Sequence, residues 1–490
     1  MGIENRAANR AANHSSQLIQ QGSFNPEQHW YSRALDSSIH PIVDFFMRLH
    51  PKQIVSRYCH LHPNVKESDL HHWLSYQPKY LQWSGTDLIH VMNKQGNREM
   101  LVIENNSCPS GQKYMPLLDH NQRQGGYRSM MEHFKPLLSA KNSSVQGALA
   151  VVYDKNTLET SGYAAALADV MNEPVHYVPF YEAEENPAVR FDKQGIMQVW
   201  GSDQRWHPIR AAFRYLTQRP WNRVPLRLKT QLVNPIIACL AGGRNKMMAA
   251  KAYDIFNGTI ATSGLKIQTP ETIWNVRKEE VPIWVKKMCG QAVIKVPYSN
   301  AGQGVFTVIN DAELEAFMRR DFPYQLFIVQ HLIGHYQWRT DDNNNNFYHI
   351  GTVPNALGES YVSDLRIVIC ATGQGIRPVC MYSRRAKQPL SNTVLNSGKS
   401  WEMLGTNLSI RKDINAWDFD VSRLLLMDQL DFDQLGLGLD DLVEGYVQSL
   451  LSMIAIDQMA QLLVSSRGTF KKKLFKSLNN DTVLLQEMMR

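Results

Sequence analysis

Apolar positions along the chain follow two different spacings, and these separate helical stretches from strand-rich ones. Residues 25–80 combine aromatic, histidine and amphipathic segments and predict helices that lead into a first strand. Short apolar runs between residues 80 and 104 flank the polar segment 93–97 (NKQGN), whose composition favours a hairpin turn. The runs 145–153 and 175–181 predict two strands of an α/β layer with a helix between them.

Beyond residue 240 the pattern predicts a helix, then strands arranged about a glycine-rich loop, and then more helix. Residues 245–256 have helical composition, and Asn257 with Gly258 would close that helix. The chain from residue 440 onward is again helical. Apolar runs predict the strands of a mostly antiparallel sheet at 293–296, 305–309, 327–333, 364–369 and 378–383.

The most apolar late stretch, residues 442–464, invites comparison with a membrane span. Glu444, Gln448 and Asp457 interrupt it, and such side chains are costly in lipid but suit the polar side of an amphipathic helix. We therefore expect no transmembrane segment and no membrane partner. Residues 1–24 lack the apolar core of a secretory signal, and we expect them to form a loose tail.

Composition narrows the class of protein further. With 490 residues, 43% of them hydrophobic and 20% charged, the chain has the balance of a globular protein of roughly three domains. The net charge of +7 is mild and the chain lacks long basic tracts, so an anionic small ligand such as a nucleotide is favoured over a nucleic acid. The six cysteines are scattered, which favours reduced thiols and a cytoplasmic protein over disulfides or a metal finger.

A candidate metal site lies in the segment 86–111 (TDLIHVMNKQGNREMLVIENNSCPSG). If its two strands fold back about their central turn, positions whose numbers sum to 191 face each other, which places Asp87 opposite Glu104. Because strand side chains alternate, Asn106 would share the face of Glu104. Two carboxylates and an amide oxygen suit Mg²⁺, which also binds water and substrate phosphates. The alternative is an exposed hairpin whose acidic side chains bind nothing.

A candidate phosphate site surrounds Lys295, which ends a predicted strand directly before the loop 299–304 (SNAGQG). Glycines let backbone N–H groups approach phosphate oxygens, and the ammonium group neutralises their charge. The loop is not a Walker loop, and a glycine-rich hairpin turn is the alternative. Lys246 opens a predicted helix after two glycines, which favours anions, although an ordinary first-turn lysine has the same pattern.

Charged side chains also occur on two predicted strands that are otherwise apolar. Asp364 and Arg366 lie on the first of these strands, and Arg384 follows the second. An arginine in such a strand must be paired or must face a cleft, and its planar guanidinium suits phosphate or carboxylate. A structural salt bridge between Asp364 and Arg366 is the alternative.

Together these residues resemble the ATP-grasp superfamily, and in particular its circularly permuted branch. That branch carries an Asp, a short turn, E-x-N and then P-S-G, and this chain supplies Asp87, Glu104, Asn106 and residues 109–111 in that order. In ordinary ATP-grasp ligases, such as D-alanine ligases, the equivalent cluster comes at the end of the sequence. The chain departs from the pattern at His331, where a hinge acid is common, and at Gly85, where many permuted members have an Arg.

The resemblance implies a site for ATP and two Mg²⁺ ions. The metal ligands would be Asp87, Glu104 and Asn106. Asp364, Arg366, Arg384 and Asn407 would lie near the transferred phosphoryl group. Two lysines, a phosphate loop and an adenine hinge would bind the nucleotide, and they fall on Lys246, Lys295, Ser299, Asn300, Ala301, Gly302, Gln303, Gly304, Gln330, His331, Leu332 and Ile333.

It also implies an α/β (α+β) fold with an ATP-grasp-like architecture in circularly permuted order, in which antiparallel sheets sandwich a nucleotide. The expected parts of the chain are the tail 1–24, N-terminal helices with the metal-binding segment 25–135, an α/β substrate domain 136–240, the nucleotide-binding domain 241–415 and a helical region 416–490.

The implied activity is that of an ATP-dependent carboxylate–amine ligase, whose substrates are a small-molecule carboxylate and an amine. ATP would convert the carboxylate into an acyl phosphate, and the amine would then attack it to form an amide. The sequence identifies neither substrate and gives no basis for an oligomeric state. The alternatives are a phosphotransferase on the same fold, which stops at phosphorylation, and a catalytically silent nucleotide-binding or scaffold protein.

Overall fold

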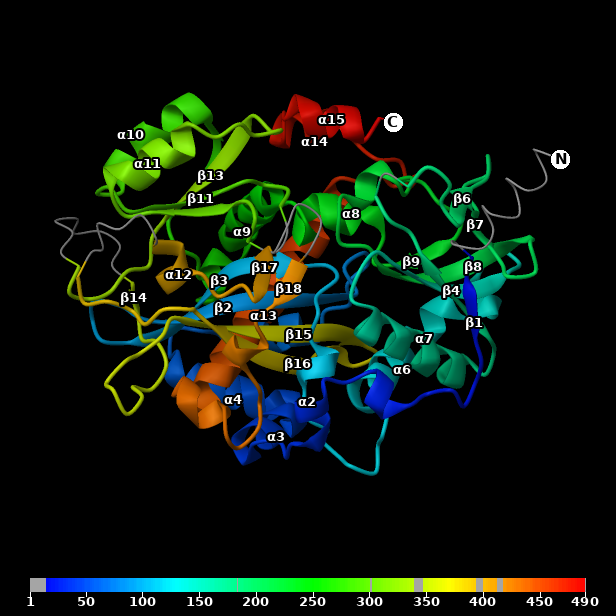
Figure 1. Cartoon of the computed structure of the whole chain (residues 1–490), viewed down its shortest axis with the longest axis horizontal. Coiled ribbons are helices and arrows are strands. Elements are labelled where there is room, and N and C mark those ends of the chain that lie inside the picture. Colours follow the sequence, from blue (N-terminus) through cyan, green and yellow to red (C-terminus); the bar gives the residue numbers. More distant parts are fainter. Residues whose placement is uncertain are drawn as a thin grey trace.

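Three sheets organise the part of the chain that the computed structural model describes, which is residues 15–182, 184–299, 302–338, 347–393, 400–411 and 417–489. These sheets have seven, six and four strands, and a two-stranded ribbon accompanies them. Figure 1 shows the six-stranded sheet in the middle, the seven-stranded sheet on the right and the four-stranded sheet at the upper left. The expected mixed α/β class is confirmed.

Helices precede the first central strand, as the sequence pattern predicts. Two of them begin with a proline that follows a histidine, His40 or His50, whose ring nitrogen accepts a backbone N–H of the first turn. These caps fix where the two helices start. The helices before the central sheet are α2 (Ser32–Asp36), α3 (Pro41–Arg48), α4 (Pro51–Leu61) and α5 (Glu67–Leu74).

The seven-stranded sheet is the α/β layer expected from the runs at 145–153 and 175–181. Its parallel strands are, in spatial order, β5 (Val175–Pro179), β4 (Ala148–Tyr153), β8 (Trp206–Tyr215) and β9 (Gln231–Val233). The predicted helix, α7 (Thr157–Met171), connects β4 to β5 and packs against α6 (Gly125–Leu138). Two antiparallel strands, β7 (Met197–Trp200) and β6 (Val189–Phe191), extend the sheet beyond β8.

One edge of this sheet corrects an expectation about the N-terminus. The strand β1 (Gln17–Ile19) pairs antiparallel with β5, so these residues do not belong to a loose tail. Ser16 reinforces the pairing, because its hydroxyl lies 2.9 Å from Nδ1 of His176 on β5. Backbone pairing with an exposed sheet edge needs little apolar sequence, which is why the composition of this segment did not reveal the strand.

The six-stranded sheet joins segments that lie far apart in the sequence. The hairpin of β2 (Trp83–Met92) and β3 (Arg98–Asn106) pairs through β2 with β15 (Ser363–Thr372), so an early hairpin completes a late sheet. β15 in turn pairs with β16 (Gly375–Arg385). Two short strands, β14 (Tyr348–His349) and β19 (Leu424–Leu425), lie at the ends of the sheet.

The four-stranded sheet is separate from the six-stranded one, which corrects the expectation of a single sheet for all the late strands. Its order is β10 (Thr272–Arg277), β13 (Leu326–His331), β11 (Ala292–Lys295) and β12 (Val305–Val308). The helices α10 (Val281–Lys287) and α11 (Asp311–Met318) accompany it (Figure 1). Apart from α9 and α13, which are described below, the α-helices and strands not yet named are short. They are α8 (Ile236–Ala238), α12 (Ser400–Leu404), the ribbon strands β17 (Ser409–Arg411) and β18 (Trp417–Phe419), α14 (Lys472–Leu478) and α15 (Thr482–Glu487).

The helix α9 (Lys246–Ile260) does not end where its sequence predicts. It continues through Asn257 and Gly258, and the chain reaches a left-handed conformation, with φ +81°, only at Gly264. The amide of Asn257 pairs instead with the backbone of Ile267, which holds the following segment against the helix. This tertiary contact outweighs the local preference of Asn-Gly for a helix end.

The long helix α13 (Leu439–Leu462) is buried on nearly all sides, which corrects the expectation that its polar residues face water. It packs against β2, β3, β15 and α9. Asp457 is fully buried and accepts the backbone N–H groups of Lys79, Tyr80 and Leu81 as the chain enters β2. Across the described ranges, no helix is long and apolar enough to cross a membrane.

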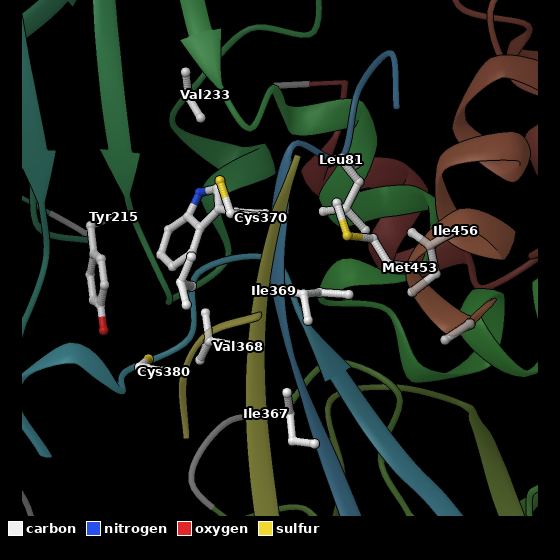
Figure 2. Close-up of a cluster of buried hydrophobic side chains, with 14 of the residues drawn as sticks. Leu81, Tyr215, Val233, Ile367, Val368, Ile369, Cys370, Cys380, Met453 and Ile456 are labelled. Atoms are coloured by element: carbon white, nitrogen blue, oxygen red, sulfur yellow. The ribbon is translucent and has the colours of Figure 1, made fainter. Parts of the chain in front are cut away.

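The alternating side chains of β15 place this strand at the centre of the hydrophobic core (Figure 2). Ile367 and Ile369 point toward α13, where Met453 and Ile456 lie, whereas Val368 and Cys370 point toward the α/β layer. Because both faces of the strand are buried, its sequence reads as a continuous apolar run rather than as an alternating one. The polar side chains at its Asp364 end therefore stand out as candidates for function.

Candidate functional site

The predicted pairing of the two acidic strands is confirmed, although the turn that produces it differs from the expected one. Asp87 and Glu104 are direct partners in the ladder, as are Gly85 and Asn106. Nearer the turn the register differs by one residue, because Asn93 pairs with Asn97 across the tip. A bulge between Asp87 and Leu88 restores the predicted pairing.

A cavity of about 110 Å³ opens between the four-stranded and six-stranded sheets. Many of the predicted site residues line it, and they come from both sheets and from the segment after α12. These lining residues are Asp87, Glu104, Lys295, Gln330, His331, Leu332, Ile333, Asp364, Arg384 and Asn407. The described residues Asn106, Lys246, Ser299, Gly302, Gln303, Gly304 and Arg366 lie outside this lining, and Asn300 and Ala301 lie outside the described residues.

Asp87 is held by two arginines at the edge of the cavity. Arg366 donates two hydrogen bonds to its carboxylate, of 2.5 Å and 2.6 Å, and Arg384 lies 3.1 Å away. Burial alone would raise the pKa of Asp87, but the two guanidinium groups hold it at about 2. The carboxylate is therefore ionised and fully paired.

Arg384 also binds Asp364, so that two acids and two arginines form one buried network. Arg384 donates to Asp364 through Nε, at 3.0 Å, and through a second, shorter bond. The hydroxyl of Thr406 donates to the same carboxylate at 2.8 Å. The alternative of a salt bridge between Asp364 and Arg366 is not what these contacts show. Arg366 lies opposite Asp87 and Arg384 lies opposite Asp364 in the sheet register, and these are the pairs that form.

The two candidate nucleotide lysines lie on either side of Glu104. The Lys246 ammonium group is 3.2 Å from the Glu104 carboxylate and donates to the backbone oxygen of Ser299 at 2.8 Å. Lys295 donates to the backbone oxygen of Ile103 at 3.1 Å. Burial lowers the pKa of Lys295 to about 8, against the opposing effect of Glu104. A phosphate between the lysines would relieve this desolvation and their mutual repulsion.

Asn106 does not line the cavity, and its side-chain oxygen is bound by an arginine that sequence reasoning missed. Arg244 donates to Oδ1 of Asn106 at 3.2 Å and to the backbone oxygen of Cys108 at 3.2 Å. The amide nitrogen of Asn106 is buried and has no hydrogen-bond partner among the described residues. Its position in the sequence could have identified Arg244 as a candidate, because it lies two residues before Lys246 in the segment GGRNK.

The oxygen donors at the cavity suit a hard cation such as Mg²⁺. Glu104 and Asp87 are ladder partners, and cationic groups already lie against both, Lys246 on Glu104 and Arg366 on Asp87. A Mg²⁺ ion at Glu104 would take the place of the ammonium group, whereas one at Asp87 requires Arg366 to withdraw. In the part of the chain that the structure describes, no cluster of three His, Cys, Asp or Glu residues is arranged to hold a metal. The residues fit Mg²⁺ that arrives with phosphate oxygens.

The glycine-rich loop closes against the segment that follows α12. Gly302 has φ +73°, and a Cβ there would lie 2.4 Å from Nδ2 of Asn407. A Cβ on Gly304 would lie 2.5 Å from the side chain of Ser299. Thr307 and Ser400 are also joined by a hydrogen bond of 2.5 Å between their hydroxyl groups. The structure thus brings Gly302 of the phosphate-loop candidates close to Asn407.

The hinge candidates, residues 330–333, form a wall of the cavity that has both polar and apolar side chains. Gln330 donates to the hydroxyl of Thr272 at 2.9 Å, and His331 Nδ1 lies 3.0 Å from the Leu332 backbone oxygen. Nε2 of His331 is buried and has no partner among the described groups. Apolar side chains surround this wall, which suits a flat heteroaromatic ring. They are Ile89, Ile103, Val293, Leu332, Ile333 and Leu404.

The P-S-G segment has a structural role in the described contacts. The hydroxyl of Ser110 and the backbone N–H of Gly111 donate to Glu159 in the first turn of α7, at 2.7 Å and 3.0 Å. A Cβ on Gly85 would lie 2.4 Å from Pro109. The space beside Gly85 is therefore filled by Pro109, and Arg366 from the neighbouring strand approaches Asp87.

The fold and the site define an α/β protein with a cavity between two of its sheets that is lined by both charged and apolar side chains. No protein-family profile matches the chain, and no curated protein matches it. Among solved structures, the chain is similar to a glutathione synthetase-like effector (GSS30) from Globodera pallida. The identity is 12%, the match covers 71% of this chain and 86% of that chain, and the TM-score is 0.39.

Two further solved structures resemble parts of the chain. A RimK domain ATP-grasp protein from Sphaerobacter thermophilus is 14% identical over 48% of this chain and 90% of its own, with a TM-score of 0.29. D-alanyl-alanine synthetase A from Vibrio cholerae is 12% identical over 49% of this chain and 89% of its own, with a TM-score of 0.29. Because identities and TM-scores are low, the function is argued below from the site.

Proposed function

We propose that the protein is an ATP-dependent ligase that joins a carboxylate to an amine through an acyl phosphate. The observation that carries the proposal is the convergence of acids, lysine and arginine in one cavity between two sheets. Glu104 and Lys295 provide opposite charges in its lining, and Arg384, which lies 3.1 Å from Asp87, provides a guanidinium. Such a site can neutralise a polyphosphate and position a second anion beside it.

In this proposal the nucleotide lies between the two sheets. Its base packs against the hinge residues 330–333, and its phosphates lie near Lys295, Lys246 and the loop that contains Gly302 and Gly304. Glu104, with Asp87, would hold Mg²⁺. The metal would neutralise charge on the terminal phosphates. Lys246 then exchanges its contact with Glu104 for a contact with phosphate oxygen.

The carboxylate substrate binds at the arginine end of the cavity. Its oxygen attacks the γ-phosphorus of ATP, the bond to the β–γ bridging oxygen breaks, and ADP leaves. Arg384 and Arg366 stabilise the negative charge of the phosphoryl group as it moves. The amine then attacks the acyl carbon, inorganic phosphate leaves with the bonding electrons, and the nitrogen loses a proton to give the amide.

Engagement of Arg366 with substrate requires it to share or release Asp87. The two acids Asp87 and Asp364 keep both guanidinium groups ionised and oriented in the absence of substrate, because each acid accepts paired hydrogen bonds. Thr406 and Tyr382 provide secondary contacts that limit how far the network relaxes. The substrate anion replaces Asp87 as a partner of the arginines.

The proposal is tested by supplying the purified protein with Mg-ATP, pooled carboxylic acids and hydroxylamine. Hydroxylamine intercepts an acyl phosphate, so a hydroxamate together with ADP is expected, and mass spectrometry identifies the acid. A stable phosphorylated product with neither amide nor hydroxamate would favour the phosphotransferase. Binding of ATP without turnover under any acid and amine would favour the silent alternative.

A further inference from the structure

A group of basic side chains lies at the carboxyl edge of the parallel sheet, just beyond the proposed site. Lys155 lies two residues after the end of β4, where the strand order reverses between β5 on one side and β8 on the other. In open α/β sheets this reversal creates a crevice that binds ligands. Lys113 approaches the same place from the segment after the P-S-G motif, and donates to the side chain of Asn156.

Lys155 has no hydrogen bond or ion pair with any residue that the structure describes, and its side chain reaches solvent. Desolvation by the protein groups around this exposed side chain lowers its pKa to about 8, and the charges of Arg244, Arg366 and Lys113 act in the same direction. Several cations are thus held close together against their mutual repulsion. An anion bound among these side chains would offset their repulsion.

The acids nearest to this basic group are committed to other donors. Asp154 opposes the lowering of the Lys155 pKa but accepts two backbone N–H groups and the guanidinium of Arg223. Glu159 accepts from Ser110, Gly111 and further groups on its own side of α7. Among the described residues, the carboxylates of Asp154 and Glu159 are therefore shared with donors other than Lys155.

A second, independent feature points to the same ligand chemistry. The buried amide nitrogen of Asn106, which is 6% exposed, has no acceptor among the described residues, although the oxygen of the same amide accepts from Arg244. This amide nitrogen is therefore a hydrogen-bond donor that lies next to the guanidinium of Arg244. Buried donors are almost always paired, so an acceptor on a ligand accounts for it.

We infer that the carboxylate substrate carries a second anionic group, a carboxylate or a phosphate, which binds to Lys155, Lys113 and Arg244. This inference rests on the proposed function and adds the substrate class to it. A series of contacts connects the cavity to Lys155. Arg366 binds Asp87 at the cavity and lies beside Gly85, against which Pro109 packs. Ser110, the next residue, accepts a hydrogen bond of 3.2 Å from Asn156, the neighbour of Lys155. One small molecule can therefore present its reacting carboxylate to Arg366 and Arg384 and its second anion to the lysines.

The test compares three matched acids by calorimetry on the full chain. Glutarate and 4-phosphonobutyrate carry a second anion, and butyrate lacks it. We expect one or both dianions to bind about tenfold or more tightly than butyrate, the usual contribution of a charge-assisted contact. Repeating the titration at pH 8 in buffers of different ionisation enthalpy should reveal proton uptake, because the anion raises the pKa of Lys155 from about 8.

Lys155→Met should abolish both the preference for the dianion and the proton uptake. The matched control is Lys141→Met, an exposed lysine that precedes β4 at the other edge of the sheet, and this variant should behave as wild type. Equal binding of all three acids, or an unchanged preference in Lys155→Met, would overturn the inference. Preference between glutarate and 4-phosphonobutyrate decides between carboxylate and phosphate.

Nucleotide measurements separate this inference from the proposed function. Lys155→Met should bind Mg-ATP as wild type does, because Lys155 is not part of the nucleotide site. If wild type fails to bind ATP or to form any hydroxamate yet binds a dianion through Lys155, the ligase proposal is wrong and the anion site stands. If it forms hydroxamates with monoanionic and dianionic acids equally well, the ligase stands and the inference is wrong.

Discussion

Replacement of Arg384 tests the reacting end of the cavity most directly. Its guanidinium lies 3.1 Å from Asp87 and makes paired bonds to Asp364, and it is 7% exposed. Arg384→Ala should reduce turnover about a hundredfold or more, the usual loss for one transition-state donor of about 2.7–4 kcal/mol. ATP affinity should stay within a few-fold, because the lysines carry most of the contact with phosphate.

The alanine variant also disturbs stability, so a second substitution is needed. Removing one member of a buried ion pair costs about 3–5 kcal/mol of stability. Here Thr406 still donates to Asp364 and Arg366 still donates to Asp87, so we expect a cost at the lower end of this range. Arg384→Lys keeps the charge but loses the paired geometry, so it should be nearly as stable as wild type and still lose at least about tenfold in turnover.

The assay is hydroxamate formation under single-turnover conditions, with ATP affinity from calorimetry and unfolding followed by circular dichroism. The matched control is Arg385→Lys, because the adjacent arginine faces the other side of β16 and lies over the ring of Tyr361 at 4.5 Å. Turnover within a few-fold of wild type in Arg384→Lys and Arg384→Ala, or an equal loss in Arg385→Lys, would refute the assignment of Arg384 to the reacting group.

Three further outcomes follow from the described contacts. Glu104→Gln should preserve folding yet remove most ATP turnover, because an amide is a poorer Mg²⁺ ligand; full activity contradicts the metal assignment. Gly304→Val should weaken ATP binding measured by calorimetry, since even its Cβ would lie 2.5 Å from the Ser299 side chain; unchanged binding places the nucleotide elsewhere. Burial holds the pKa of His176 at about 4, below its usual 6.5, so only the unfolded chain takes up a proton between these values. The free energy of unfolding should therefore fall by up to about 3 kcal/mol as pH drops from 6.5 to 4. In His176→Gln, the free energy of unfolding measured in urea should depend less on pH over this range. An equally steep dependence in that variant would show that His176 is not the group responsible.

Local patterns in the sequence were sufficient where a contact depends on near neighbours. The pairing of Asp87 with Glu104 follows from strand alternation and a polar turn, both of which lie within one short segment. The strands on either side of the glycine-rich loop are also found as expected. The exact turn was missed because a bulge compensated for the difference in register, and a one-residue bulge has no distinct composition.

Contacts between distant segments were beyond the reach of such patterns. Asp457 reads as a solvated helix position, yet it is buried because it binds the backbone at residues 79–81. The pairing of Arg366 with Asp87 rather than with Asp364 depends on which strands become neighbours. Arg244 had no motif of its own and is defined only by its contact with Asn106. Candidate site residues could be proposed from residue types and their spacing in the sequence. Their hydrogen-bond and ion-pair partners could be identified only once the fold was known.

The pairing of β2 with β15 has a consequence for biosynthesis. Met92 ends β2 and Ser363 begins β15, so about 270 residues must be added before the hairpin finds its neighbour. At ribosomal rates this takes on the order of tens of seconds, during which an apolar strand edge has no partner. The α/β layer between them can fold first, as domains generally do during synthesis. The nascent hairpin is therefore the segment of this protein that most needs protection by a chaperone.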